Sequence, residues 1–127
     1  MNNHLVSRIA IYILSVVMIA FGINHFRHPK DLYVYVPAFL PGGIIWVYIV
    51  GVFFILAAIS FLLNRMVQIA AYLLALMLFI FALTIHLPNY LHSGDVEMQN
   101  LALVNLLKDS ALAAFALHIG SNAKTVG

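Results

Sequence analysis

Two apolar runs separated by only three residues decide the fold. Residues 44–63 read IIWVYIVGVFFILAAISFLL, residues 64–66 read NRM, and residues 67–88 read VQIAAYLLALMLFIFALTIHLP. Each run has the roughly 20 apolar residues that a transmembrane helix needs. The second run shows none of the apolar and polar alternation that is typical of a transmembrane β-strand. The sequence therefore predicts two antiparallel membrane helices joined by a tight turn.

Two more apolar runs, residues 5–25 and 98–120, flank this hairpin. The chain of 127 residues is 65% hydrophobic, and neither residues 32–64 nor residues 66–94 contain Lys, Arg, Asp or Glu. A water-soluble domain, in which roughly a quarter of the residues are charged, could not cover its surface with so few. We predict an all-α, polytopic four-helix membrane bundle in a single domain. Its helices are expected at about 5–25, 44–63, 67–88 and 98–120.

The segment between the first two helices, residues 26–43, is rich in prolines and aromatic residues. Pro29, Pro37 and Pro41 forbid a continuous helix there, and the aromatic side chains suit the headgroup layer. We predict a Pro/aromatic-rich interfacial loop that forms an ordered cap over the mouth of the bundle. The alternative is a belt that only sets the depth of the protein in the membrane.

Charge and cysteine content narrow the possible partners. Four spans place both termini on one side, with Arg8, Arg65 and Lys124, against Arg27 and Lys30 on the other. The positive-inside rule then assigns both termini to the cytoplasm. The chain has no cysteine, which excludes disulfides and thiolate metal sites. Its net charge of +2 is too small and scattered to suggest nucleic acid, and no basic run is present. The long apolar runs make the lipid bilayer the expected partner.

Ionisable residues inside the fourth predicted helix are the strongest sign of a functional site. Lys108 and Asp109 lie near its middle, where a charged side chain costs roughly 2.5–3.5 kcal/mol on insertion scales. Asn105 lies one turn before Asp109 on the same face. Two interpretations stay open. The pair neutralises itself and only fixes the rotation of the helix, or it belongs to a proton-linked or ligand-binding site with Asn105 as a hydrogen-bond relay.

Histidine is the second sign. His25 ends the first predicted helix and His86 nearly ends the third, so both lie near the same interface. Helical phase turns both inward, with Tyr72 on the face of His86. Two inward histidines fit a bis-histidine haem or another metal, but Phe21 and Phe79 compete for the space a haem needs, and we assign no metal ligands. A hydrogen-bonding role and plain interfacial histidines are the other interpretations.

Several motifs in the chain resemble the DoxX family of small four-helix membrane proteins. They are GINHF at residues 22–26 followed by Pro29, PAFLP at 37–41 followed by Trp46, TIHLP at 84–88, and NLLKD at 105–109. The resemblance extends from residue 5 to residue 118. It implies a membrane redox role in the plasma (inner) membrane of a bacterium or archaeon, with a quinone as a partner; the cofactor itself stays unknown.

The resemblance also implies which residues act. We carry over His25, His86, Lys108 and Asp109 as the residues that perform the chemistry, and we add Asn24, Asn105 and Tyr72 as cofactor-binding residues. Because the chain has no cysteine, electrons would pass through a bound cofactor, a quinone in preference to haem, or through a partner subunit. The chain would then be an accessory or small subunit of a quinone-linked redox system; whether it is itself an enzyme stays open.

A second function, from a different class, fits the same residues. It is a non-enzymatic membrane scaffold or small lipophile-binding protein, in which the inward polar residues only hold the bundle together. A transporter is less favoured, because four short-looped helices need a homo-oligomer to form a pathway and the sequence shows no pair of broken helices.

Overall fold

The computed structural model describes residues 3–123, and over these residues the chain forms helices and no strand. Four helical spans are long and apolar enough to cross a membrane. They are α1 (Asn3–Arg27), α3 (Ile45–Leu63), the continuous span Val67–His92, and α6 (Val96–Asn122). The prediction of an all-α chain with four long apolar helices is therefore confirmed.

The third span continues beyond Pro88, where the sequence suggested that it ends. It consists of α4 (Val67–Phe81), the π-helical turn η1 (Ala82–His86) and α5 (Leu87–His92). Pro88 is the second residue of α5 and has no backbone N–H to donate to the preceding turn. Since its ring also crowds the carbonyl one turn earlier, the helix widens just before it, and the Leu87 N–H donates to the carbonyl of Ala82.

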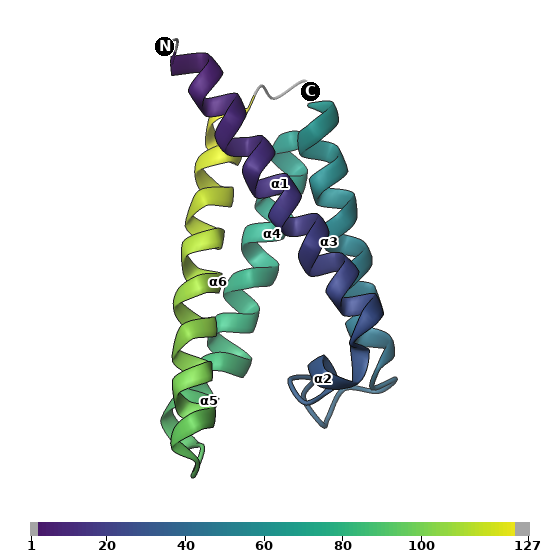
Figure 1. The fold of residues 1–127 in the computed structure, drawn as a ribbon, viewed down its shortest axis with the longest axis vertical. Helices are drawn as coiled ribbons and strands as arrows, with labels where there is room; N and C mark the ends of the chain where they lie inside the picture. The colour runs from purple at the N-terminus through teal and green to yellow at the C-terminus, as the bar shows by residue number, and fades with distance from the viewer. Residues whose placement is uncertain (1–2, 124–127) are drawn as a thin grey trace.

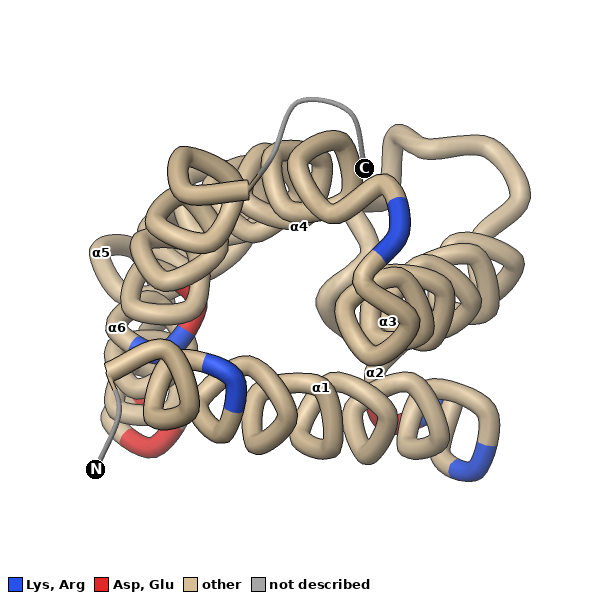
Figure 2. Tube along the Cα trace, turned by 90° about the horizontal axis from the view of Figure 1, so that it is seen from above, with Lys and Arg blue, Asp and Glu red and all other residues tan. Residues whose placement is uncertain are grey.

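The four spans pack as two helix pairs. α1 lies against α3, α4 lies against α6, and α3 contacts α4 less extensively. Figure 1 shows that α1 begins at the same end of the molecule at which α6 finishes. The short helix α2 (Pro29–Tyr33) and its loop lie at the opposite end, as does α5. From above, long lengths of the spans carry no Lys, Arg, Asp or Glu (Figure 2).

The α1–α3 pair is held at a crossing of two glycines. A Cβ built on Gly22 would lie 2.9 Å from the backbone oxygen of Gly51, and a Cβ on Gly51 would lie 3.2 Å from that of Gly22. The two helix backbones therefore touch directly. Small residues allow this close approach, which is the main source of van der Waals packing between helices in lipid.

Small residues also pack the half of α4 and α6 nearest the chain ends. Ala71, Ala75, Ala113 and Ala116 are all buried there. Near the end of α6, the side-chain amide of Gln68 donates to the carbonyl of Gly120 over 3.0 Å. In this half α4 and α6 are in direct contact, and the cavity described below lies in the other half. A second cavity, at the end of the molecule where α1 begins, is lined by Ser7, Val67 and Phe115 among others.

Candidate functional site

A cavity of about 190 Å³ lies at the loop end of the molecule. Most of its lining is apolar or aromatic, and it comes from all four long spans and from the loop before α3. Apart from Tyr35 and Trp46, its polar residues are His25, Asn105, His86, Lys108 and Asp109. The structure therefore brings five of the seven predicted site residues to one cavity.

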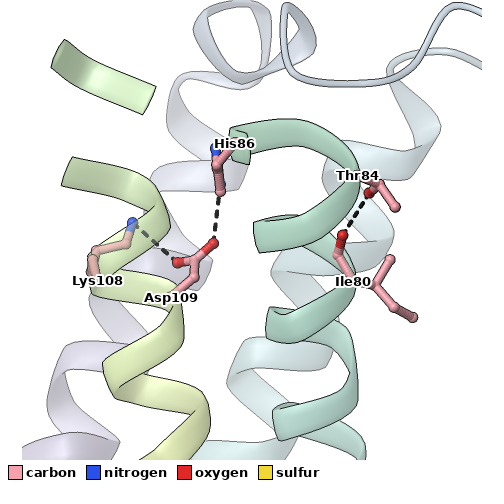
Figure 3. A network of polar contacts seen from close by, with 5 residues as sticks. All are labelled: Ile80, Thr84, His86, Lys108 and Asp109. Carbon is pink, nitrogen blue, oxygen red and sulfur yellow. Dashed lines mark hydrogen bonds and ion pairs between the residues drawn. The ribbon is translucent and has the colours of Figure 1, made fainter. Parts of the chain in front are cut away.

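His86 and Asp109 form the closest polar contact in this cavity. Nε2 of His86 on η1 lies 3.0 Å from Oδ2 of Asp109 on α6 (Figure 3). Both side chains are buried, with 9% of His86 and 6% of Asp109 exposed. A carboxylate has no hydrogen to donate, so His86 donates its Nε2–H to Asp109. The pair joins the π-helical turn to the middle of α6.

Lys108 is the second partner of Asp109. Its Nζ lies 3.6 Å from Oδ1 of Asp109 and 4.8 Å from the ring centre of Phe21 on α1. The side chain is 42% exposed, because adjacent residues on a helix point about 100° apart and Lys108 reaches back from the edge of the buried face. Asp109 thus has the predicted contact to Lys108, but its closer and more buried partner is His86.

His25 contributes an imidazole from the opposite helix pair. Its Nδ1 lies 2.6 Å from the backbone carbonyl of Phe21, one turn earlier in α1, and the carbonyl can only accept. The ring packs at a tilt against Phe54 of α3, with the ring centres 5.5 Å apart. Because Nδ1–H is used within the helix, the lone pair of His25 is on Nε2.

The loop before α3 covers this end of the cavity. Leu32, Tyr35, Val36 and Leu40 are among its residues that line the space. The ring of Tyr35 meets that of His86 edge to face, with 5.8 Å between the centres. The indole N–H of Trp46 donates to the carbonyl of Pro41 over 2.6 Å and ties the end of the loop to α3.

Asn24 and Tyr72, the other two predicted site residues, lie outside the cavity lining. Asn24 is exposed on α1, because it is rotated by about 100° from His25. Tyr72 packs beside Gly120 near the chain ends. It shares an approximate face with His86, but a separation of 14 residues places it about 21 Å away along the span.

Tyr35 is a cavity residue that the sequence did not single out. Tyr33 ends α2 and Tyr35 lies in the loop that follows, and Tyr33 is exposed whereas Tyr35 lies against His86. The direction in which each side chain points depends on the path of the backbone here. An irregular loop has no helical period from which that direction could be predicted. No group of three or more His, Asp or Glu residues that could hold a metal ion occurs within residues 3–123.

A family model described as a domain of unknown function (DUF8561) matches residues 14–120. The chain belongs to this family. The DUF8561 match contains every residue that lines the cavity. No curated protein and no solved structure matches the chain. The geometry of the cavity is therefore the main basis for assigning a function to this DUF8561 member.

Proposed function

We propose that the chain is a multi-pass integral membrane protein that binds a small lipophilic molecule with a ring-shaped polar headgroup, of the quinone type. The buried His86–Asp109 pair at the edge of a mostly apolar cavity carries this proposal. The membrane is the plasma membrane of a bacterium or archaeon, and both termini are in its cytoplasm.

The outward faces of the four spans support the location in a membrane. Large apolar side chains are exposed along each span, among them Ile13, Ile49, Leu76 and Leu107. Such a surface has no partner in water, where large exposed apolar patches cause association, but it is the surface that lipid requires. Arg8 and Arg65 belong to the end of the molecule where α1 begins, consistent with a cytoplasmic side there; Lys124 lies outside the described residues.

The size and lining of the cavity support a ring-shaped headgroup. An apolar cavity of roughly 150 Å³ can take up benzene, so about 190 Å³ accommodates a substituted ring. Ligand sites are mostly apolar, with a few polar groups that fix orientation. Here the polar groups are two imidazoles, an amide, an ammonium and a carboxylate, which together can donate to and accept from the oxygens of a quinone or quinol.

The redox role rests on the resemblance to the DoxX family described above, together with this cavity. A quinone bound beside His86 and Asp109 would supply the electron transfer, while the chain holds and orients its headgroup. Electrons would be exchanged with a partner redox subunit. The chain is then an accessory or small subunit of a quinone-linked system.

Trp46 gives a direct test, because it is the single tryptophan of the chain and lines the cavity. Decylubiquinone and a short-chain menaquinone are titrated into the purified protein in nanodiscs, and quenching of Trp46 fluorescence is followed. We expect saturable quenching that is lost in Val50→Phe, which fills the cavity. It should persist in Thr84→Val, since the Thr84 side chain is exposed on the other face of the span.

Non-saturable quenching by both quinones, equal in the wild type and in Val50→Phe, would overturn the proposal. In that case the polar residues only hold the helices together, and the chain is a membrane scaffold. If the chain binds quinone but exchanges no electrons, it is a lipophile-binding protein, and its assignment as a subunit of a redox system is wrong.

A further inference from the structure

We infer that Nδ1 of His86 accepts a hydrogen bond from the ligand, so that the cavity selects headgroups with a hydroxyl, such as a quinol or a phenol, over headgroups that only accept. This inference rests on the proposed function for the presence of a ligand in the cavity. It adds the chemical form of that ligand and the atom that recognises it.

The first observation is an unpaired polar atom. His86 Nδ1 is buried and has no hydrogen-bond partner among the residues that the structure describes. Buried polar atoms are nearly always paired, and leaving one unpaired is costly. The His86 side chain is about nine-tenths buried and lines the cavity. Because the His86 side chain lines the cavity, a molecule bound there is the candidate partner for this atom.

The second observation is the fixed tautomer of His86. Its Nε2 lies 3.0 Å from Oδ2 of Asp109, so the ring hydrogen is on Nε2 and the lone pair is on Nδ1. The Lys108 ammonium lies 3.6 Å from the other carboxylate oxygen of Asp109. Asp109 is thus a positioning residue, which acts on the ligand through the orientation and tautomer of His86.

These two observations set the direction of the hydrogen bond. A hydroxyl group in the cavity can donate to Nδ1 and remove the cost of the unpaired atom. A carbonyl or ether oxygen brings a second lone pair toward it and leaves both unsatisfied. Lys108 and Asn105 offer donors to oxygens at other positions of the headgroup. Headgroup oxygens that only accept can therefore bind at Lys108 or Asn105. Among the acceptors that line the cavity, Nδ1 of His86 is the buried atom that lacks a partner, so we assign the hydroxyl to it.

The test uses two probes that differ only in whether the phenolic oxygen carries a hydrogen or a methyl group. 4-Nonylphenol donates a hydrogen bond, and its methyl ether, 4-nonylanisole, cannot. Each probe competes with decylubiquinone in nanodiscs, and recovery of Trp46 fluorescence is measured. We expect the phenol to compete at about a tenfold lower concentration than the ether, the factor for one hydrogen bond to a buried acceptor.

Variants then locate the acceptor. In His86→Phe the phenol should lose its advantage while the ether competes within about twofold of the wild type, which also shows that the cavity has survived. In Asp109→Asn the amide can donate to Nε2, which moves the ring hydrogen to Nδ1, and the advantage should fall as well. Thr84→Val is the matched control and should keep the full advantage.

The outcomes separate this inference from the function on which it rests. If neither probe competes and decylubiquinone does not bind, the proposed function fails. If both probes compete equally in the wild type, the cavity binds lipophiles but Nδ1 does not select them, and this inference is overturned without any variant. A phenol advantage that survives in His86→Phe overturns it too, because the acceptor would then be another group.

Discussion

The two halves of the α4–α6 pair are held together in different ways. Near the chain ends, Ala71, Ala75, Ala113 and Ala116 bring the helices into close contact with no charged group between them. Toward the loop, the π-helical turn widens the span, and His86 meets Asp109 beside a cavity. In lipid the first arrangement is held by van der Waals packing and the second by a charged hydrogen bond. One helix pair thus combines a closed half that stabilises the fold with an open half that can bind.

The largest expected effect is the loss of Asp109 in the open half. Asp109→Leu leaves the Nε2–H of His86 buried without its acceptor, so the free energy of unfolding should fall by about 3–5 kcal/mol. The double variant His86→Leu with Asp109→Leu should recover most of that loss, because both polar groups are then gone. Unfolding in mixed detergent micelles measures the stability of the wild type, the single variant and the double variant.

Lys108 provides the control for this prediction. The pair Lys108→Met with Asp109→Leu should recover less than the pair with His86→Leu, since Lys108 is half-exposed and its ammonium lies 3.6 Å from the carboxylate, against 3.0 Å for His86. Equal destabilisation in the single and both double variants would mean that the open half is not held by this pair, and the contrast between the halves would disappear.

The closed half should be sensitive to added volume. Ala113 is fully buried between α6 and its neighbours. Ala113→Leu forces extra carbon atoms into a packed interface and should lower the free energy of unfolding by about 1–3 kcal/mol. Ala114→Leu, one residue further along α6 but exposed, is the matched control and should change it little. If Ala113→Leu left the free energy of unfolding unchanged, the small residues would have to leave unfilled space between α4 and α6.

The fold was largely predictable because a membrane span imposes a requirement that composition alone reveals. Residues 66–94 lack any charge and residues 67–83 hold a long apolar run, so a helix there follows from length and hydropathy. The outcome at Pro88 was not predictable in the same way. Proline ends a helix, kinks it or begins a new turn, and which of these occurs depends on whether neighbouring groups satisfy the freed carbonyls.

The candidate site was predictable where burial of a charge requires a partner. Asp109, Lys108 and His86 are costly in an apolar helix, so their approach to one another follows from their depth. Tyr72 shows the limit of helical phase. The phase correctly gives the face of the helix on which a residue lies, but it does not say how far apart two residues on that face are along the helix axis. The role of His86 as the closer partner of Asp109 was missed, because sequence adjacency favoured Lys108, and neighbours on a helix point in different directions.

Added volume in the cavity beside the open half should affect binding and not stability. Val50 lies on the wall of the cavity, and its replacement in Val50→Phe puts the larger ring into existing space. The free energy of unfolding should change by about 1 kcal/mol or less, while quinone-dependent quenching of Trp46 is lost. If Val50→Phe destabilised the protein as strongly as Ala113→Leu, the two halves would be equally packed and the cavity would not be a binding space.

The smallest expected effect concerns the outer face of the same span. Thr84 lies two residues before His86, but its hydroxyl donates to the carbonyl of Ile80 in its own helix over 2.6 Å, away from Asp109 (Figure 3). Thr84→Val keeps the shape of the side chain and removes a hydroxyl that reaches no other element. The free energy of unfolding should therefore change by about 0.5 kcal/mol or less, as for surface substitutions away from buried features. Unfolding in the same micelles and Trp46 quenching check this together. A loss comparable with that of Asp109→Leu would place the polar determinants of the open half in the π-helical turn itself, and not in the His86–Asp109 pair.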